Sequence, residues 1–557
     1  MIQRRDFLRG SVAAALGGLV AGCSARIGSD PTAAAASRRA GNRPNFLVIV
    51  GDDMGFSDAG CYGGDIATPN LDRLASNGLR FTQCYSTARC WPSRTCILTG
   101  YYAQQVRMDP PVGRIPAWAR VLPHYFKPLG YRCYHSGKWH LMGAPQPVKD
   151  GGFDRSYCID DHDRFFNPKQ ARLDDKRLPP VKENSGFYLT TEIANRGIEF
   201  LTQHSQSHAN EPFLLYLAFT SPHFPLQALP RDIAKYKDRF IDGWDAARQR
   251  HWQRLRQMGI VSCDLPPLDP HTIPSWNLPE AELREKIGPG EVGHALPWND
   301  LSEVQKEFQA TKMAIHAAMV DRMDQEIGRV LQQLKSLGAF ENTVILFVSD
   351  NGASAEQLIR GDLHDPAAPP GSAKTFLCLG PGWSSASNSP LRLHKSWVHE
   401  GGISSPLIVH WPAGIADGGE LRQNPAHFID IIPTMLELAG GSASDSWQGQ
   451  KSPPLPGRSL VPAFRNDHSV SHPYLYFHHL DNWAIRVGDW KVVAKGGGSA
   501  ELYDLSNDRC ESDNLAGKYP QKVAEMSALW KRCDEEFVAM AGPAEPATRP
   551  AKPPGRQ

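Results

Sequence analysis

The sequence predicts a layered α/β fold: a large mixed, mostly parallel sheet between helices, then a smaller antiparallel sheet with one helix. Three observations indicate it: continuous apolar runs that end in polar residues, amphipathic segments between them, and short alternating runs after about residue 472. The 557 residues allow one large domain and a smaller partner. We therefore expect domains at 44–465 and 466–541, a signal peptide and flexible tether at 1–43, and a disordered tail at 542–557.

The individual elements follow from hydrophobic periodicity. The runs typical of strands buried on both faces are 45–50, 213–219 and 344–348. The intervening helical patterns are 70–77, 190–201 and 303–337. The short C-terminal strands are expected at 474–477, 483–487 and 490–493, with a final helix at 521–540. Strands and helices alternate as a layered α/β fold requires.

The first thirty residues have the features of an export signal. Arg4 and Arg5 precede a short apolar stretch, 12–21, that is too short to span a bilayer. The arginine pair resembles a twin-arginine signal, which makes the Tat export machinery an expected partner. The four residues ending at Cys23 resemble a bacterial lipobox, although a chance cysteine near a cleavage site is the alternative. We expect an exported bacterial protein, periplasmic or held at the membrane only by a lipid on Cys23.

The net charge argues against nucleic-acid binding, and the cysteine content limits what can be said about disulfides. The formal net charge is +1 and 21% of residues are charged, so no global basic field exists to hold nucleic acid. Eleven cysteines are present, and setting Cys23 and Cys90 aside leaves an odd number at irregular spacing. No complete disulfide framework can be deduced, although one or two bridges could form after export.

Oxygen-bearing side chains follow two of the predicted buried strands. Asp52 and Asp53 follow the first strand, and Asp350 and Asn351 follow the third. Because the carboxyl ends of parallel strands meet at one edge of a sheet, we expect these side chains to converge. Three carboxylates and an amide oxygen suit calcium or magnesium better than zinc. For either pair alone, solvated turn residues are the alternative.

The most specific signal is a run of fixed residues. Residues 90–100 have the sequence CWPSRTCILTG, which resembles the signature C-x-P-S-R-x-x-x-L-T-G of the type I (formylglycine-dependent) sulfatases, arylsulfatase-like members of the alkaline phosphatase superfamily. Other segments that resemble family motifs occur in the family's order at 52–55, 68–72, 137–140, 221–223, 349–352, 400–402 and 501–505. The resemblance implies an alkaline-phosphatase-like fold and a sulfuric ester hydrolase.

The resemblance also implies a modified nucleophile and one metal ion. Cys90 would be oxidised to formylglycine by a formylglycine-generating or an anaerobic sulfatase-maturing enzyme, and its hydrate would attack sulfur. The implied ligands of one Ca²⁺, in preference to Mg²⁺, are Asp52, Asp53, Asp350, Asn351 and the modified Cys90. A buried, unmodified thiol is the alternative for Cys90, but Pro92 and Arg94 at the family's offsets argue against it.

Five further residues match positions that act on the sulfate group in the family. Lys138 and Lys395 would clamp the sulfate, with solvated surface lysines as the alternative. Arg94 would orient the diol, and the N-terminus of its helix would favour the anion. His140 would trigger sulfate elimination, and His223 would protonate the leaving group together with Lys395. The remaining histidines are expected to be structural or exposed, including His394, His399, His478 and His479.

The substrate is expected to be the sulfate ester of a carbohydrate or of an aryl alcohol. The loop 353–390 joins the metal ligands to Lys395 and should pass near the pocket. Its candidates for substrate contacts are Arg360, His364 and Trp383, each of which could equally belong to a loop that only closes the fold. An insert at 226–298 could cap the cleft; its noted residues are Lys235, Tyr236, Trp244 and Arg248.

Two other functions remain open from the sequence. Phosphonate and phosphodiester hydrolases of the same superfamily also carry formylglycine, so the nucleophile alone does not establish sulfate as the substrate. A lipid-anchored glycan-binding protein that keeps the fold but is never oxidised at Cys90 is the other alternative. The complete set of catalytic residue types argues against it.

Overall fold

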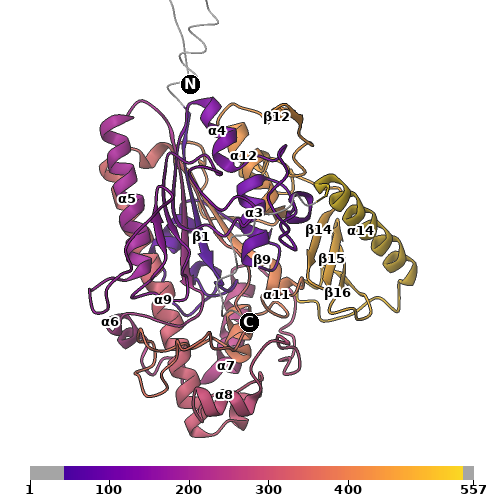
Figure 1. The fold of residues 1–557 in the computed structure, drawn as a ribbon. Coiled ribbons are helices and arrows are strands. Elements are labelled where there is room, and N and C mark those ends of the chain that lie inside the picture. Colours follow the sequence, from indigo (N-terminus) through magenta and orange to yellow (C-terminus); the bar gives the residue numbers. More distant parts are fainter. Residues whose placement is uncertain (1–42, 544–557) are drawn as a thin grey trace, which may run out of the picture. The chain divides into compact units, whose positions relative to one another are not determined.

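A large mixed sheet forms the centre of the computed structural model, which describes residues 43–543 (Figure 1). The strand order is β10-β2-β9-β8-β1-β7-β3-β4-β5-β6, and β11 pairs with β2. Its strands are β1 (Asn45–Asp52), β2 (Leu79–Tyr85), β3 (Arg132–Lys138), β4 (Arg155–Ile159), β5 (Ala171–Leu173), β6 (Lys176–Arg177), β7 (Phe213–Pro222), β8 (Thr343–Ser349), β9 (Ser404–His410), β10 (Glu420–Arg422) and β11 (Ala426–His427).

The middle of this sheet is parallel. Strands β8, β1, β7, β3 and β4 run side by side in the same direction. The strand β9 is antiparallel to both β8 and β2. In the register, Phe46 of β1 lies between Leu214 of β7 and Val344 of β8, so the three apolar runs are adjacent strands. The predicted mixed, mostly parallel sheet is confirmed.

Helices cover both faces of the sheet (Figure 1). They are α2 (Pro69–Ser76), α3 (Cys90–Thr99), α4 (Leu122–Phe126), α5 (Leu189–Ser207), α6 (Pro230–Ile233), α7 (Gly243–Gln257), α8 (Glu280–Lys286), α9 (Glu303–Ser336), α10 (Pro381–Ser387), α11 (Glu400–Ile403), α12 (Ile431–Leu438) and α13 (Val461–Arg465). Side chains of β1 alternate between two cores: Leu47 and Ile49 join the core under α5 and α9, and Phe46 and Val48 join the core under α3 and α12.

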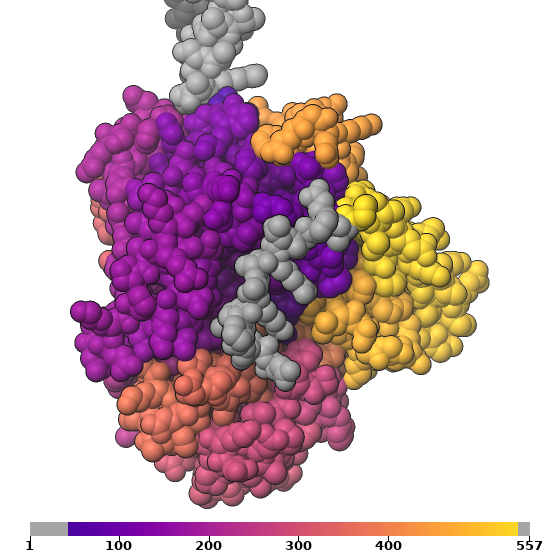
Figure 2. All heavy atoms as spheres, in the orientation of Figure 1, coloured from indigo at the N-terminus to yellow at the C-terminus, as the bar shows by residue number. Residues whose placement is uncertain are grey.

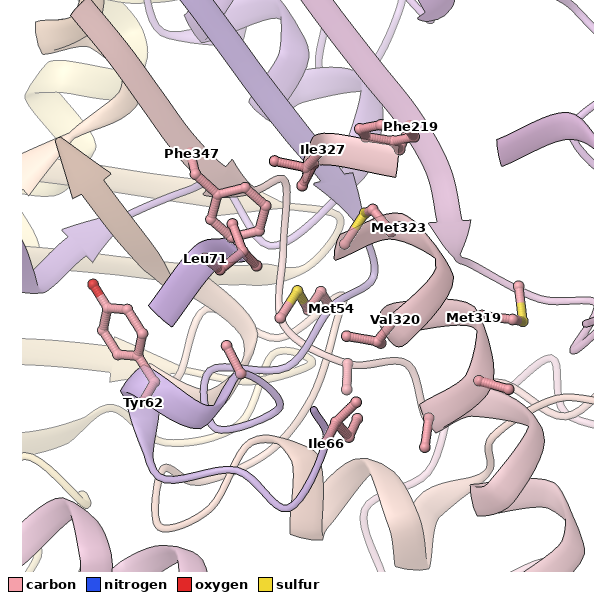
Figure 3. Packing of buried hydrophobic residues seen from close by; sticks show 14 of the residues in the cluster. Met54, Tyr62, Ile66, Leu71, Phe219, Met319, Val320, Met323, Ile327 and Phe347 are labelled. Carbon is pink, nitrogen blue, oxygen red and sulfur yellow. The ribbon is translucent and has the colours of Figure 1, made fainter. Parts of the chain in front are cut away.

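The long helix α9 fixes the loop that follows β1. Figure 3 shows Val320 and Met323 of α9 lying beside Met54, which comes directly after the two aspartates. Met54 is fully buried in this cluster. Since a buried apolar anchor limits the motion of a loop, this packing holds the carboxyl end of β1 in place.

A second, smaller sheet lies near the C-terminus. Its strands are β14 (Leu475–His479), β15 (Asn482–Val487), β16 (Trp490–Ala494) and β17 (Glu501–Asp504), all antiparallel in that order. The helix α14 (Pro520–Ala541) packs on it, and Trp530 of α14 stacks on Tyr476 with ring centroids 5.9 Å apart. A short hairpin of β12 (Ser446–Trp447) and β13 (Gln450–Lys451) precedes it. The predicted antiparallel sheet with one helix is confirmed, whereas the domain boundaries stay predictions.

The insert 226–298 is tied to the C-terminal sheet. A disulfide joins Cys263 to Cys510, 247 residues away in sequence. Lys495, directly after β16, donates a hydrogen bond to the Thr272 hydroxyl over 2.9 Å. In Figure 2 the rose-coloured insert accordingly lies next to the orange and yellow C-terminal residues. One or two disulfides were expected, and the described residues contain one.

The predicted export signal and the lipobox cysteine, Cys23, lie outside the described residues, as does the tail from 544 onward. The export signal, the lipid anchor and the disordered tail therefore stay predictions. Between residues 43 and 543, no helix combines the length and the apolar character needed to cross a bilayer.

Candidate active site

The side chains after β1 and β8 meet at the carboxyl edge of the sheet. Asp52, Asp350 and Asn351 are fully buried, and Asp53 is nearly so. The Asn351 amide donates to Asp53 Oδ1 over 2.7 Å, and the Asp53 backbone N–H donates to Asp350 Oδ1 over 3.3 Å. Asp53 adopts a left-handed backbone conformation (φ 65°), which is uncommon for residues other than glycine. The four predicted ligands thus lie together.

This cluster fits a hard cation. Within residues 43–543, the buried atoms Asp52 Oδ1 and Asn351 Oδ1 have no hydrogen-bond donor. Buried polar atoms without partners are rare in folded proteins, and an ion that binds oxygen would satisfy both. His223 also offers a ligand atom within 4.8 Å of atoms of Asp52 and Asp53. Because oxygen atoms dominate the set, it favours calcium or magnesium over zinc.

Three cationic side chains offset the three carboxylates. Lys138 Nζ lies 2.6 Å from Asp52 Oδ2, and Lys395 Nζ lies 2.8 Å from Asp53 Oδ2. Arg94 Nε donates to Asp350 Oδ2 over 2.8 Å. All these groups are almost completely buried, where unpaired charges would be strongly destabilising. The two lysines are therefore not solvated surface residues.

Cys90 is the first residue of α3, so it lies at the amino end of that helix. Arg89 before it is extended, and the Ser93 hydroxyl accepts a hydrogen bond from Thr87 N–H over 3.0 Å, which closes the turn. Arg94 is one turn further along the same face. Burial raises the pKa of the Cys90 thiol and outweighs the opposing effect of the nearby Lys138 and Lys395 charges. Cys90 therefore faces the same charged centre as Arg94.

Two predicted catalytic histidines flank this centre. His223 Nε2 lies 3.7 Å from Asp53 Oδ2, and its Nδ1 bonds the backbone carbonyl of Phe224. Burial, followed by the charges of Lys395 and Lys138, lowers the pKa of His223. Burial and then Lys138 lower the pKa of His140 in the same way. Both rings are therefore neutral near pH 7 and can accept protons.

Sequence reasoning missed His162. Its ring lies 5.8 Å from that of His140 and 5.3 Å from that of His223, so it completes a group of three histidines. It follows β4, a parallel neighbour of β3, so its strand ends at the same edge of the sheet. Had residues 155–159 been predicted as a parallel strand, the position of His162 just after that strand would have indicated a place in the site.

Glu356 was also missed. Its Oε2 lies 3.1 Å from Lys395 Nζ, and its Oε1 lies 3.0 Å from Arg89 Nη2. Burial alone would raise the pKa of the Glu356 carboxyl. The charges of Lys395 and Arg89 together have a larger effect in the opposite direction and lower this pKa, so the carboxyl stays ionised. Glu356 lies in the loop expected to pass near the pocket, but nothing in that loop's sequence distinguishes this glutamate from its neighbours.

The three candidate substrate contacts have different environments. Arg360 pairs with Asp163 and lies over the Phe224 ring at 5.3 Å, beside the histidine group. His364 Nδ1 accepts a hydrogen bond from Phe376 N–H over 2.9 Å, which links parts of its own loop.

The prediction for Trp383 is wrong. Its side chain is fully buried, and its Nε1 donates to the Gln309 carbonyl over 2.7 Å. Trp244 and Trp298 lie against its ring, at 5.7 and 5.8 Å between centroids. Because the ring is enclosed by other side chains and its N–H already has an acceptor, Trp383 cannot contact a substrate and belongs to the core.

Other residues noted in the insert are structural. Lys235 and Tyr236 both bond Asp321 of α9, and Arg248 donates to the Pro266 carbonyl. Trp244 is buried. The histidines expected outside catalysis are held by other groups: His394 by Ser384, His399 by Glu501, His478 by Asp534 and His479 by Asp109.

Comparison with protein families assigns this fold and site to a class. The family model described as Sulfatase matches residues 44–442, and the model described as N-sulphoglucosamine sulphohydrolase, C-terminal, matches residues 392–537. The chain belongs to the sulfatase family of the alkaline-phosphatase-like superfamily, and it is a sulfuric ester hydrolase.

Individual relatives agree along most of the chain. It is 30% identical to an uncharacterised sulfatase of Schizosaccharomyces pombe, over 90% of this chain and 95% of that one. It is 29% identical to the arylsulfatase of Klebsiella aerogenes, over 75% and 91% of the two chains. It is 25% identical to the N-acetylglucosamine-6-O-sulfatase of Bacteroides thetaiotaomicron, over 89% and 87%.

Solved structures share the fold. One, in complex with its substrate D-glucosamine-2-N,6-O-disulfate, has a TM-score of 0.61 at 20% identity and covers 89% of this chain and 98% of its own. Another, in complex with k-i-k-neocarrahexaose, has a TM-score of 0.62 at 22% identity and covers 90% and 95%.

Proposed function

We propose that this sulfatase cleaves the sulfate ester of a sulfated carbohydrate or aryl alcohol through an oxidised Cys90. The observation that carries the proposal is the position of Cys90 at the amino end of α3, one turn from Arg94 and beside the Asp52–Lys138 pair. The N-acetylglucosamine-6-O-sulfatase relative and the disulfate-bound structural neighbour support a carbohydrate substrate.

Oxidation of Cys90 would convert its thiol-bearing carbon to the aldehyde of formylglycine, and this step needs a maturation enzyme. The aldehyde hydrate would supply one hydroxyl to attack sulfur and a second hydroxyl whose deprotonation releases sulfate. Cys90 is only 3% exposed in the folded chain. We therefore infer that oxidation precedes the completion of folding.

The ion that fits the oxygen cluster is Ca²⁺, with Mg²⁺ as the second choice because it tolerates irregular geometry poorly. Asp52, Asp53, Asp350 and Asn351 would hold it, with the modified Cys90 as a further ligand. When bound, it would neutralise a sulfate oxygen and favour ionisation of the attacking hydroxyl.

The protein's own groups would then divide the work. Lys138 and Lys395 would bind sulfate oxygens, since both ammonium groups already point at the carboxylates of this centre. A carbonyl oxygen only accepts hydrogen bonds, so the contact with Phe224 places the His223 proton on Nδ1. Lys395 Nζ would supply the proton for the leaving alcohol, and His223 Nε2, which is unprotonated in this tautomer, would take that proton up and relay it; His140 would accept a proton when sulfate is released.

Export is part of the proposal. A disulfide such as Cys263–Cys510 persists in oxidising compartments and is rare in the cytosol. Together with the twin-arginine and lipobox patterns, it supports passage through the Tat machinery to the periplasm, with Cys23 as the site of a lipid anchor.

Side-by-side kinetics test the chemistry. Chain co-produced with a maturation enzyme should hydrolyse an aryl sulfate with a kcat/KM that exceeds those for an aryl phosphodiester and a phosphonate ester. Removal of the ion with a chelator should abolish turnover, and added Ca²⁺ should restore it. A higher kcat/KM for the phosphodiester or phosphonate would contradict sulfate as the preferred substrate.

A further inference from the structure

An exposed indole stands at the edge of the charged centre. Trp276, from the insert, is 40% exposed and is the one tryptophan within residues 43–543 whose side chain is exposed. Its Nε1 donates to Glu356 Oε1 over 2.8 Å, and the other oxygen of Glu356 lies 3.1 Å from Lys395 Nζ. A single carboxylate therefore separates the indole from a lysine of the sulfate site.

A guanidinium connects this indole to the residue beside the nucleophile. Arg89 lies over the Trp276 ring and over the Trp91 ring, at 5.4 Å from each centroid. Trp91 follows Cys90 directly, and its ring lies 6.0 Å from that of His140. We call Trp91, Arg89 and Trp276 the aromatic array. It runs from the nucleophile position to the exposed indole.

The array leaves one polar atom unsatisfied. Within residues 43–543, the buried Trp91 Nε1 has no acceptor. Buried N–H groups normally find partners, so this donor is available to a bound molecule. It is a second observation, independent of the exposure of Trp276, that points to a ligand beside the array.

The backbone around Trp276 is fixed in place. The next residue, Asn277, donates to the Ala355 carbonyl over 3.0 Å and accepts from Gln357 N–H over 2.9 Å. Leu278 N–H donates to the Gln357 carbonyl over 2.9 Å. The insert thus pairs with the loop that carries Glu356, and Trp276 is a preorganised surface.

We propose that Trp276 determines specificity by binding the ring of the leaving alcohol. The proposal rests on the proposed function. Lys138 and Lys395 are 1% and 2% exposed, so a sulfate held between them leaves only the alcohol portion to extend outward. A rigid indole at that point suits a six-membered ring, which presents a flat C–H or π face to it. Both a sugar ring and an aryl ring have this chemistry.

Kinetics with three sulfate esters test the proposal: a sulfated hexosamine, an aryl sulfate and a short-chain alkyl sulfate. Trp276→Ala should raise KM about tenfold or more for substrates with a ring, as expected for loss of a large aromatic contact, and leave kcat nearly unchanged. The alkyl sulfate should show no change in KM. The larger of the two ring effects identifies the natural leaving group as sugar or aryl.

Two variants serve as controls. Trp276→Phe keeps a ring face but removes the N–H donor to Glu356, so it should retain most of the affinity for ring substrates. Trp447→Ala removes another indole that lies under an arginine, Arg120, away from the site residues, and it should change no KM. Inhibition by inorganic sulfate, which has no ring, should be the same in all variants.

A KM unchanged by Trp276→Ala for every substrate would overturn the proposal. An equal loss for the alkyl sulfate and the ring substrates would also overturn it, because the indole would then act only by positioning Glu356 and Lys395. If the wild-type protein turned over none of the three esters, the proposed function itself would be refuted. That outcome differs from an active wild type with an unaffected Trp276→Ala variant, which would refute only the role of Trp276.

Discussion

Individual residues of the site were predictable where they belong to fixed-offset motifs. Asp52, Asp53, Lys138 and His140 lie at or just beyond strand ends, where topology directs side chains to one edge of the sheet. Glu356 lies in an irregular loop, where no periodicity sets the direction of a side chain. The prediction for Trp383 failed because the sequence reading treated 353–390 as a loop, whereas Trp383 lies on the short buried helix α10.

Replacing Glu356 by glutamine tests the residue that the sequence did not reveal. Glu356→Gln should lower kcat/KM on the order of tenfold to a hundredfold, because Lys395 and Arg89 lose a buried anionic partner and shift from their positions. Steady-state kinetics of folded protein measure the effect. Glu307→Gln, at an exposed position of α9, is the matched control and should be silent. An unchanged kcat/KM in Glu356→Gln would remove this glutamate from the site.

Among elements, the central apolar strands and the long helices α5, α9 and α14 were predicted, whereas α7, β2, β3 and β9 were not. The three apolar runs are the adjacent strands β8, β1 and β7. The strand β3 was not predicted because its sequence, RCYHSGK, is too polar to be distinguished from a loop. Its place beside β7 depends on pairing with a neighbour that local sequence does not encode.

A close approach between two segments holds the metal ligands of the β8 loop. Gly352 packs so tightly that a Cβ on it would lie 1.8 Å from the Gly401 carbonyl oxygen. Gly401 belongs to α11, six residues after Lys395. The contact therefore sets the position of Asn351 relative to the lysine loop.

Gly352→Ala should separate these segments. The expected loss of folding free energy is about 1–3 kcal/mol or more, because neither backbone can move aside freely, and activity at limiting Ca²⁺ should fall. Thermal unfolding and Ca²⁺ titration of activity measure both effects. Gly517→Ala, where a Cβ meets nothing within 4 Å, should change neither. A Gly352→Ala variant with wild-type stability would contradict the tight packing described.

At the scale of the molecule, a buried ion cluster joins the two sheets. Glu400, at the start of α11, lies 2.9 Å from Lys491 of β16 and 3.4 Å from Arg509. Lys491 also pairs with Glu511 over 2.8 Å. Both sheets were predictable from the sequence. This junction and the Cys263–Cys510 bridge were not, because they join segments far apart in the chain.

The buried ion cluster around Glu400 should make the free energy of unfolding depend on pH in the acidic range. Burial raises the pKa of Glu400, but Lys491 and Arg509 lower it more, from 4.5 to about 2. A carboxyl whose pKa is lower in the folded than in the unfolded state stabilises the fold at pH values above its unfolded-state pKa. This stabilisation is lost as the pH falls from 4.5 toward 2.

Glu400→Gln should therefore reduce stability by about 3–5 kcal/mol near neutral pH, because a buried pair loses one partner. The difference in melting temperature between wild type and variant should shrink as the pH falls below 4.5. Melting curves across this range provide the measurement. A difference that stays constant with pH would show that Glu400 is not held as a carboxylate.

The central claim is that Cys90 becomes the nucleophile by oxidation, and one measurement tests it most directly. Chain produced with a maturation enzyme is digested, and the peptide that contains Cys90 is analysed by mass spectrometry alongside turnover of an aryl sulfate. We predict a peptide with an aldehyde in place of the thiol, in a fraction that tracks the specific activity across preparations. A preparation that turns over the ester while this peptide carries only the intact thiol would contradict the account.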